Sequence, residues 1–126
     1  MPLPHRNYGP ARTLAPKGRL DHDNCEAFRA DLSPHLEACA HEHAPLVLDL
    51  SGLEYVSSAG LRCLMLAAKD ARAGSQNSRV MVAAMQPVVA EIFKISRFNL
   101  VLDVFPTLRE ALASVSPQAA EAFDRA

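Results

Sequence analysis

The sequence predicts a small α/β domain, built on a mixed, mostly parallel sheet of four to five strands with about four helices. Short apolar runs alternate with segments of ten or more residues whose apolar side chains recur at helical spacing. Crossovers of this kind join parallel strands. The chain has 126 residues, of which 49% are hydrophobic, so it can bury one hydrophobic core. We expect an N-terminal arm at residues 1–10, one domain at residues 11–116 and a C-terminal tail at residues 117–126.

The first part of the chain is rich in proline. Residues 1–10 are predicted to form a loose arm or a short edge segment. Residues 12–15 favour a strand. Because Pro16 cannot donate a backbone hydrogen bond, this strand is expected at a sheet edge, or to end at the proline. Residues 17–21 then form a turn and a brief extended segment.

The first helix is predicted to begin at Asp23. Glu26 follows three residues later, as in a capping box. Ser33 and Pro34 are expected to interrupt this helix, so that it kinks or restarts with Ser33 as the cap. The restarted helix is predicted to end near His43.

Strands and helices alternate along the rest of the chain. The predicted strands are residues 46–50, 79–84 and 100–105, and the predicted helices are residues 58–73, a segment that starts at Pro87 and a segment capped by Thr107. The run at residues 46–50 is continuously apolar, which is typical of a strand covered on both faces.

Charge and cysteine content exclude several classes of protein. A net charge of −1 argues against nucleic-acid binding, which needs clustered Lys and Arg. No apolar run approaches the roughly 20 residues of a membrane span, and the proline-broken start is unlike a secretory leader. Cys25, Cys39 and Cys63 are odd in number and widely spaced, which favours free thiols. We therefore expect a cytoplasmic protein without direct membrane insertion.

The most informative segment is residues 49–62, where a buried strand and a turn lead to two serines at a predicted helix start. A helix N-terminus exposes unpaired N–H groups and partial positive charge, so it accommodates a phosphate on Ser58. Gly60 leaves room close to the backbone. Ser57 or Ser58 can also be a simple N-cap, worth about 1 kcal/mol. The residues alone favour the cap and leave the phosphorylation site as the alternative.

From about residue 18 to residue 115, the chain resembles the STAS family, the anti-sigma factor antagonists of bacterial partner-switching systems. The matching segments are residues 18–21 (Gly-Arg-Leu-Asp), 46–51 (Leu-Val-Leu-Asp-Leu-Ser), 55–61 (Tyr-Val-Ser-Ser-Ala-Gly-Leu), 88–98 and 107–112 (Thr-Leu-Arg-Glu-Ala-Leu). Their order and spacing cover about four-fifths of the chain.

The resemblance implies that the serine turn is a phosphorylation site. The family pattern is Asp-Ser-Ser/Thr-Gly-Leu, with the serine after the Asp phosphorylated, and that serine corresponds to Ser58. Here Ser57 stands in place of the Asp and Ala59 in place of the second Ser/Thr. Ser57 is therefore a second candidate acceptor, but Ser58 keeps its position relative to Gly60.

The resemblance implies a switch and not an enzyme. Unphosphorylated, the protein would bind an anti-sigma factor that is also a serine kinase. Phosphorylation of Ser58 would release this partner, and a serine phosphatase would reset the switch. The implied contact residues are Asp21, His22, Ser57, Ser58, Gly60 and Arg62.

Arg97 departs from the family pattern, which often has glycine after the third helix. A non-glycine residue is costly at positive φ. This turn is therefore expected to be built differently.

Other functions find less support in the residues. The alternative within the family is an accessory subunit of a lipid-transport ABC complex, independent of phosphorylation; the loss of the Asp and the presence of Ala59 favour it. His35, Cys39 and His43 recur at helical spacing, but a fourth metal ligand is missing. No nucleophile elbow or glycine-rich phosphate loop is present, so neither catalysis nor a cofactor is expected.

Overall fold

The computed structural model describes residues 5–9, 11–42, 45–74, 80–97 and 102–125. The strands are β1 (His5–Tyr8), β2 (Ala11–Leu14), β3 (Gly18–Leu20), β4 (Leu46–Asp49), β5 (Leu53–Val56), β6 (Val80–Ala83) and β7 (Asp103–Phe105). The helices are α1 (Cys25–Glu42), α2 (Ser58–Gly74), α3 (Pro87–Ile95), α4 (Leu108–Val115) and α5 (Pro117–Arg125). The predicted α/β class is confirmed.

The strands form two sheets. The larger has the order β1-β2-β4-β6-β7, with β1 antiparallel to β2 and the remaining neighbours parallel. The smaller is a parallel pair of β3 and β5. β1 is thus an edge strand. Residues 1–10 were predicted to form either a loose arm or a short edge segment, and β1 agrees with the edge segment. Pro16 lies beyond the end of β2, where its missing N–H costs the ladder nothing.

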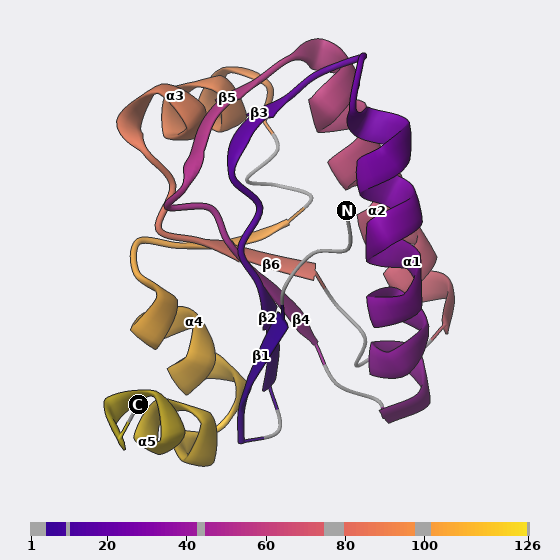
Figure 1. Ribbon diagram of the computed structural model, residues 1–126. Helices are drawn as coiled ribbons and strands as arrows, with labels where there is room; N and C mark the ends of the chain where they lie inside the picture. The colour runs from indigo at the N-terminus through magenta and orange to yellow at the C-terminus, as the bar shows by residue number, and fades with distance from the viewer. Residues whose placement is uncertain (1–4, 10, 43–44, 75–79, 98–101, 126) are drawn as a thin grey trace.

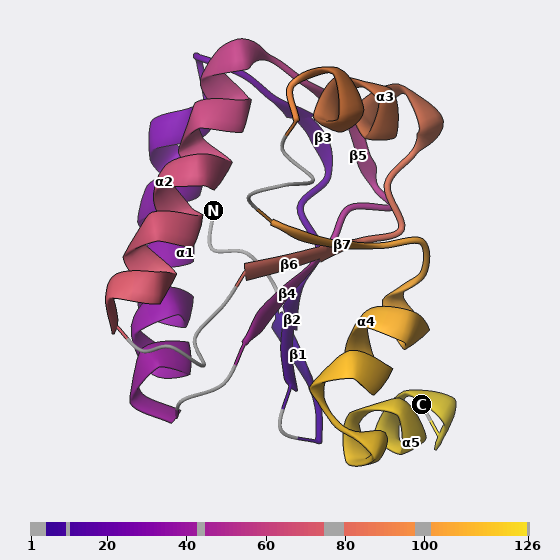
Figure 2. The same cartoon turned by 180° about the vertical axis from the view of Figure 1, so that it is seen from behind.

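The larger sheet carries helices on both faces (Figures 1 and 2). α1 and α2 pack on one face, α4 and α5 pack on the other, and α3 lies beside β5. Strand β4 is therefore covered on both faces. Leu46 and Leu48 belong to the hydrophobic cluster under α1 and α2, and Val47 belongs to the hydrophobic cluster under α4 and α5. The predicted two-sided burial of this strand is confirmed.

The two ends of the chain meet on the α4–α5 side. The ring of Tyr8 in β1 lies 5.5 Å from that of Phe123 in α5, edge to face. Asp124 accepts two hydrogen bonds from Arg109 in α4, at 3.0 and 3.1 Å. Ala119 is fully buried. Residues 117–125, predicted as part of a C-terminal tail, are therefore a packed helix.

The predicted restart of the helix at Ser33 and Pro34 is wrong. α1 runs continuously from Cys25 to Glu42 with Pro34 inside it. Proline removes one helical hydrogen bond, the one its N–H would donate to Ala30. Ala30 is exposed, so water can satisfy that carbonyl while Leu32, at 0% exposure, and Cys39, at 2%, anchor the helix on either side.

The other capping predictions hold in part. Thr107 caps α4 as predicted, since its Oγ1 accepts from the Glu110 N–H at 3.1 Å. The cap of α1 is Asn24, one residue after the predicted Asp23, because the Asn24 carbonyl accepts the first helical bond, from Phe28 N–H at 2.9 Å. The strand β5 was missed. It has four residues and follows β4 after a short turn, which left little periodicity to detect.

The turn after α3 also differs from expectation. Arg97 takes a φ of 60°, the left-handed conformation that a glycine would supply, so the turn is built in the same way without the glycine. The Ser96 N–H donates to Ile92 O at 3.0 Å, and the Arg97 N–H donates to Lys94 O at 3.2 Å. These bonds hold the arginine in a conformation that costs an L-residue about 1 kcal/mol or more.

Replacing Arg97 with glycine is therefore expected to stabilise the protein. The relief of strain exceeds the added entropy of the unfolded chain, for a net gain of about 0.5 kcal/mol in the free energy of unfolding. Urea denaturation measures it. Lys94→Gly is the matched control, since Lys94 is exposed within α3, and it should lose about 1 kcal/mol. Equal losses in both variants would contradict strain at Arg97.

Candidate functional site

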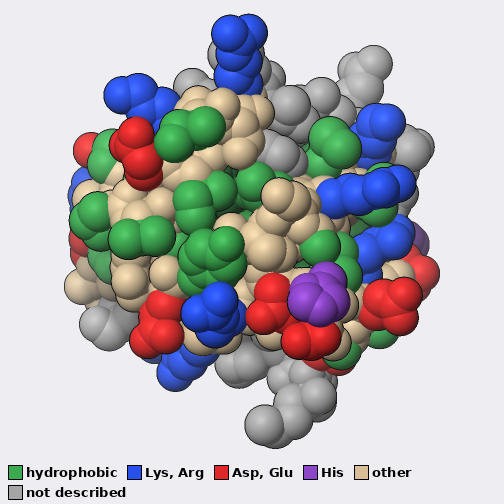
Figure 3. Space-filling model, turned by 90° about the horizontal axis from the view of Figure 1, so that it is seen from above, with side chains coloured by type: hydrophobic (Ala, Val, Ile, Leu, Met, Phe, Trp, Pro, Cys, Tyr) green, Lys and Arg blue, Asp and Glu red, His purple; other side chains and the backbone are tan. Residues whose placement is uncertain are grey.

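The start of α2 lies beside the end of β3. β3 and β5 run parallel with Leu20 opposite Val56, so the segments that follow both strands emerge at the same edge. The Ser57 N–H donates to the Leu20 carbonyl at 2.9 Å. This bond joins the serine turn to the loop that begins at Asp21, and both belong to the face seen from above in Figure 3.

Ser57 is the N-cap of α2. Its carbonyl accepts the first helical bond, from Leu61 N–H at 2.9 Å, and its Oγ accepts from Gly60 N–H at 3.2 Å. A side-chain oxygen that binds the N–H three residues on is the usual N-cap geometry. The capping interpretation of the two serines therefore applies to Ser57.

Ser58 is the first residue of α2 and is exposed. Within the described part of the chain, no hydrogen bond involves its hydroxyl. It stands at the positive end of a helix of 17 residues, where a negative group is favoured. Ser58 is thus accessible to modification, and modifying it removes no helix cap.

Gly60 is buried against β3. A Cβ at this position would lie 2.5 Å from the Leu20 carbonyl oxygen and 3.0 Å from its carbonyl carbon. No side chain fits there without moving backbone. The sequence assigned Gly60 the role of leaving room near the backbone; the structure shows that the room is filled by Leu20 of β3.

The loop between β3 and α1 is fixed by its own side chains. Asp21 Oδ1 accepts from Asp23 N–H at 3.0 Å, and Asn24 Oδ1 accepts from Asp21 N–H at 2.9 Å. The Asn24 amide also donates to Arg19 O at 2.6 Å. Asn24, which was not among the predicted site residues, therefore organises the loop. Its proximity to Asp21 in the sequence was the available signal, since Asn and Asp favour such turns.

The structure brings most of the predicted contact residues together. Asp21 follows directly on Leu20, which contacts both Ser57 and Gly60. His22 is exposed on the same loop, with its Nε2 3.2 Å from Asp23 Oδ1. Arg62 is exposed on α2, four residues after Ser58 and so on the same side of the helix.

Further residues at this end of the molecule were not predicted as contact residues from the sequence. They are Arg19 of β3, Tyr55 of β5, and Val88 and Ile95 of α3. The Arg19 guanidinium carbon lies 4.6 Å from the Tyr55 ring centroid, so β3 and β5 are also joined on their outer surface. Val88 and Ile95 of α3 are 57% and 73% exposed. Hydrophobic side chains gather on the α3 side of the face in Figure 3, and charged side chains lie around its rim.

Cys63 lies behind the serine turn and is buried. Burial, with a hydrogen bond to the Cys25 thiol, raises the pKa of Cys63 to about 11. A thiol that stays protonated at neutral pH is a poor nucleophile. The described residues contain no group of three or more His, Cys, Asp or Glu that could hold a metal ion. His43, one of the three residues considered for a metal, lies outside the described residues.

No helix in the described part of the chain is both long and apolar enough to cross a membrane.

Comparison with known proteins gives a consistent picture. Residues 9–103 match a family model described as "Mlab, STAS domain". The chain is 35% identical over 100 residues to BtrV of Bordetella bronchiseptica, a protein named as an anti-sigma factor antagonist. That alignment spans 78% of this chain and 79% of BtrV.

Solved structures with the same fold include two proteins named as anti-sigma factor antagonists. The Thermotoga maritima protein TM1081 aligns with a TM-score of 0.78 at 17% identity, over 90% of this chain and 93% of that one. SpoIIAA in its unphosphorylated form aligns with a TM-score of 0.61 at 16% identity, over 98% of this chain and 96% of that one. Phosphorylated Bacillus SpoIIAA aligns with a TM-score of 0.60 at 16% identity, over 90% of this chain and 98% of that one.

Gly60→Ala is expected to be strongly destabilising, by about 3 kcal/mol in the free energy of unfolding, because its Cβ meets backbone atoms of Leu20. Gly52→Ala is the control: its Cβ would meet the Lys17 side chain at 3.0 Å, which can move aside, so the loss should stay under about 1 kcal/mol. Thermal and urea unfolding distinguish the two. Similar losses in both variants would show that the contact with Leu20 is unimportant.

Ser57→Ala and Ser58→Ala are expected to differ although the residues are adjacent. Loss of the Ser57 cap should lower the free energy of unfolding by about 1 kcal/mol. Ser58→Ala should change it by less than about 0.5 kcal/mol, since the exposed hydroxyl holds nothing in place. A larger loss in Ser58→Ala would assign the cap to the wrong serine.

Proposed function

This chain belongs to the STAS domain family, and from that premise we propose that it is an anti-sigma factor antagonist acting as a phosphorylation-controlled partner switch. With Ser58 unphosphorylated, it binds an anti-sigma factor that is also a serine kinase. The kinase phosphorylates Ser58 and the complex dissociates. A serine phosphatase restores the binding state. The protein itself carries out no catalysis in this cycle.

The proposal rests on the different environments of the two serine side chains: one caps the helix and the other is exposed. Ser57 Oγ is occupied by the Gly60 N–H at 3.2 Å, whereas Ser58 is exposed at the first position of α2. Phosphorylating Ser57 would remove the helix cap. Phosphorylating Ser58 leaves the cap intact, so Ser58 is the better acceptor. Ser57 thereby supplies the capping oxygen at the position where the family pattern has an Asp.

A phosphate on Ser58 changes the surface without unfolding the domain. It adds a charge of about −1.5 to −2 and three acceptor oxygens. In the free protein, the helix N-terminus favours this charge, and Arg62, one turn along α2, lies within reach of it. In a complex, the same dianion has to leave water, which costs several kcal/mol when no partner group pairs with it. Each 1.4 kcal/mol is about a tenfold loss of affinity.

The proposed partner surface is the face that surrounds Ser58. It comprises Asp21, His22, Ser57, Ser58, Gly60 and Arg62. The fixed geometry of the Asp21–Asn24 loop supports this assignment, since three of its hydrogen bonds, at 2.6 to 3.0 Å, hold the loop ready for docking. Gly60 contributes through its packing on Leu20 and not through a side chain.

The second candidate function is an accessory subunit of a lipid-transport ABC complex. It is favoured by the two departures from the family pattern, Ser57 in place of the Asp and Ala59 in place of the second Ser/Thr. A turn that is not phosphorylated does not need the residues of the phosphorylation pattern. In that role Ser58 is an exposed residue of α2 and its charge state does not matter to the partner.

Affinity capture from the native organism separates the two functions. With Ser58→Ala as bait, we expect recovery of a small ATP-binding serine kinase, identified by mass spectrometry. Ser58→Asp should retain at least about tenfold less, because a charge is placed where the partner docks. Ser33→Asp is the matched control, since Ser33 is an exposed serine on α1 away from this face, and it should capture as much as the unmodified protein.

Incubating the captured kinase with the protein and ATP then tests the acceptor. One phosphate should appear in the wild type and none in Ser58→Ala. An ATP-binding cassette subunit retained equally by the Ala and Asp baits would overturn the switch and support the accessory role.

A further inference from the structure

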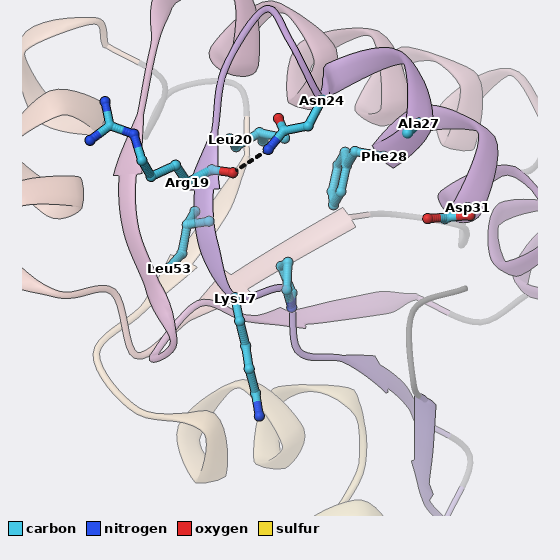
Figure 4. A pocket seen from close by; sticks show the side chains of 9 residues that line it. Lys17, Arg19, Leu20, Asn24, Ala27, Phe28, Asp31 and Leu53 are labelled. Carbon is cyan, nitrogen blue, oxygen red and sulfur yellow. Dashed lines mark hydrogen bonds between the residues drawn. The ribbon is translucent and has the colours of Figure 1, made fainter. Parts of the chain in front are cut away.

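A pocket of about 470 Å³ opens between β3 and the first turns of α1 (Figure 4). This is within the size range of small-molecule sites, about 300 to 1,000 Å³. Its floor is apolar: Leu20, Phe28 and Leu53 line it and are all at least nine-tenths buried. The exposed Ala27 forms part of the rim, and the buried Pro16 also lines the pocket. The lining can therefore bury an apolar body of modest size.

The two basic residues at the pocket direct their charges elsewhere. Arg19 lies over the Tyr55 ring, 4.6 Å from its centroid, and in Figure 4 its guanidinium extends away from Phe28. In the same view the Lys17 side chain also extends away from Phe28 and Asp31. The Asn24 amide is engaged by Arg19 O at 2.6 Å. The Arg19 guanidinium and the Asn24 amide thus already have partners within the protein.

Asp31 is the exception. It comes from the second turn of α1, is half-buried, and in Figure 4 its carboxylate is at the pocket end opposite Arg19. Within the described part of the chain, no ion pair or hydrogen bond engages this carboxylate. Its neighbour one turn along α1, His35, has its pKa lowered by burial and by the Arg12 guanidinium. His35 is therefore neutral above its usual range, near 6.5, and adds no positive charge of its own beside Asp31.

We propose that this pocket binds a small amphipathic cation, with an aryl or alkyl body against Leu20, Phe28 and Leu53 and a protonated amine or guanidinium against Asp31. The apolar floor stabilises the body by removing it from water. The carboxylate pairs with the cation, and the Phe28 ring beside it favours positive charge. An anion of the same shape would place its charge against Asp31 and would gain a basic partner only if Arg19 left Tyr55 or Lys17 turned back toward the pocket.

The ligand site is separate from the phosphorylation face but touches it. Leu20 contributes its side chain to the pocket and its carbonyl to the Ser57 N–H. Binding of the cation needs neither Ser58 nor a protein partner, so the site stands whether or not the chain is a partner switch.

Nuclear magnetic resonance titration of the full, ¹⁵N-labelled chain tests the proposal. Phenethylamine is the probe and phenylacetate, of similar shape and opposite charge, is the control. At about pH 8, where the amine is charged and His35 is neutral, phenethylamine should give saturable shifts at the amides of Leu20, Ala27, Phe28 and Leu53. Phenylacetate should give none below about 20 mM.

Variants separate the pocket from non-specific association. Asp31→Asn should weaken phenethylamine binding about fivefold, the value of one partly exposed ion pair. Ala27→Trp should abolish it by filling the pocket from the rim. Glu26→Gln removes an exposed carboxylate on the same helix that does not line the pocket and should bind as wild type.

The ¹⁵N spectrum of each variant reports whether it is folded, so lost binding cannot be confused with unfolding. Equal binding of phenylacetate, wild-type binding by Asp31→Asn, or the absence of saturable shifts at the pocket amides would each overturn the proposal.

Discussion

The contact between the first turn of α2 and the end of β3 is the constraint on which this end of the molecule depends. The Leu20 carbonyl accepts the Ser57 N–H at 2.9 Å and lies where any Cβ on Gly60 would have to be. Only glycine allows this approach. Because helix and strand are held at backbone distance, the serine turn and the Asp21 loop form one surface and not two independent loops.

Under the proposed function, this turn serves both the stability of the helix and its modification. Ser57 faces the helix and supplies the capping oxygen, while Ser58, next to it, faces solvent. Neighbouring residues at a helix start point in different directions, so the cap and the proposed phosphate acceptor are different side chains. A substitution that preserves a capping oxygen at position 57 therefore leaves residue 58 exposed at the helix start, so a serine can replace a capping aspartate without altering the proposed acceptor.

The hydrophobic clusters on the two faces of the larger sheet hold this surface in place. β4 and β6 bury alternate residues in the two clusters, Leu48 and Val82 on the α1–α2 side and Val47 and Met81 on the α4–α5 side. α1 and α2 are thereby fixed to the same strands. The loop before α1 and the turn before α2 are therefore held at a fixed distance from each other, and the pocket lined by Leu20 and Phe28 forms between these elements.

The sequence alone determined the α/β class, the alternation of most elements, the Thr107 cap and the place of the two serines at a helix start. These are local properties, read from periodicity and from residues a few positions apart. Only the tertiary structure decided which serine is the cap, why Gly60 is glycine, that β5 pairs with β3, that α1 continues through Pro34, and that Asp31 faces an apolar pocket. Each of these depends on groups distant in the chain, or on water and packing around them, and no local pattern records such contacts.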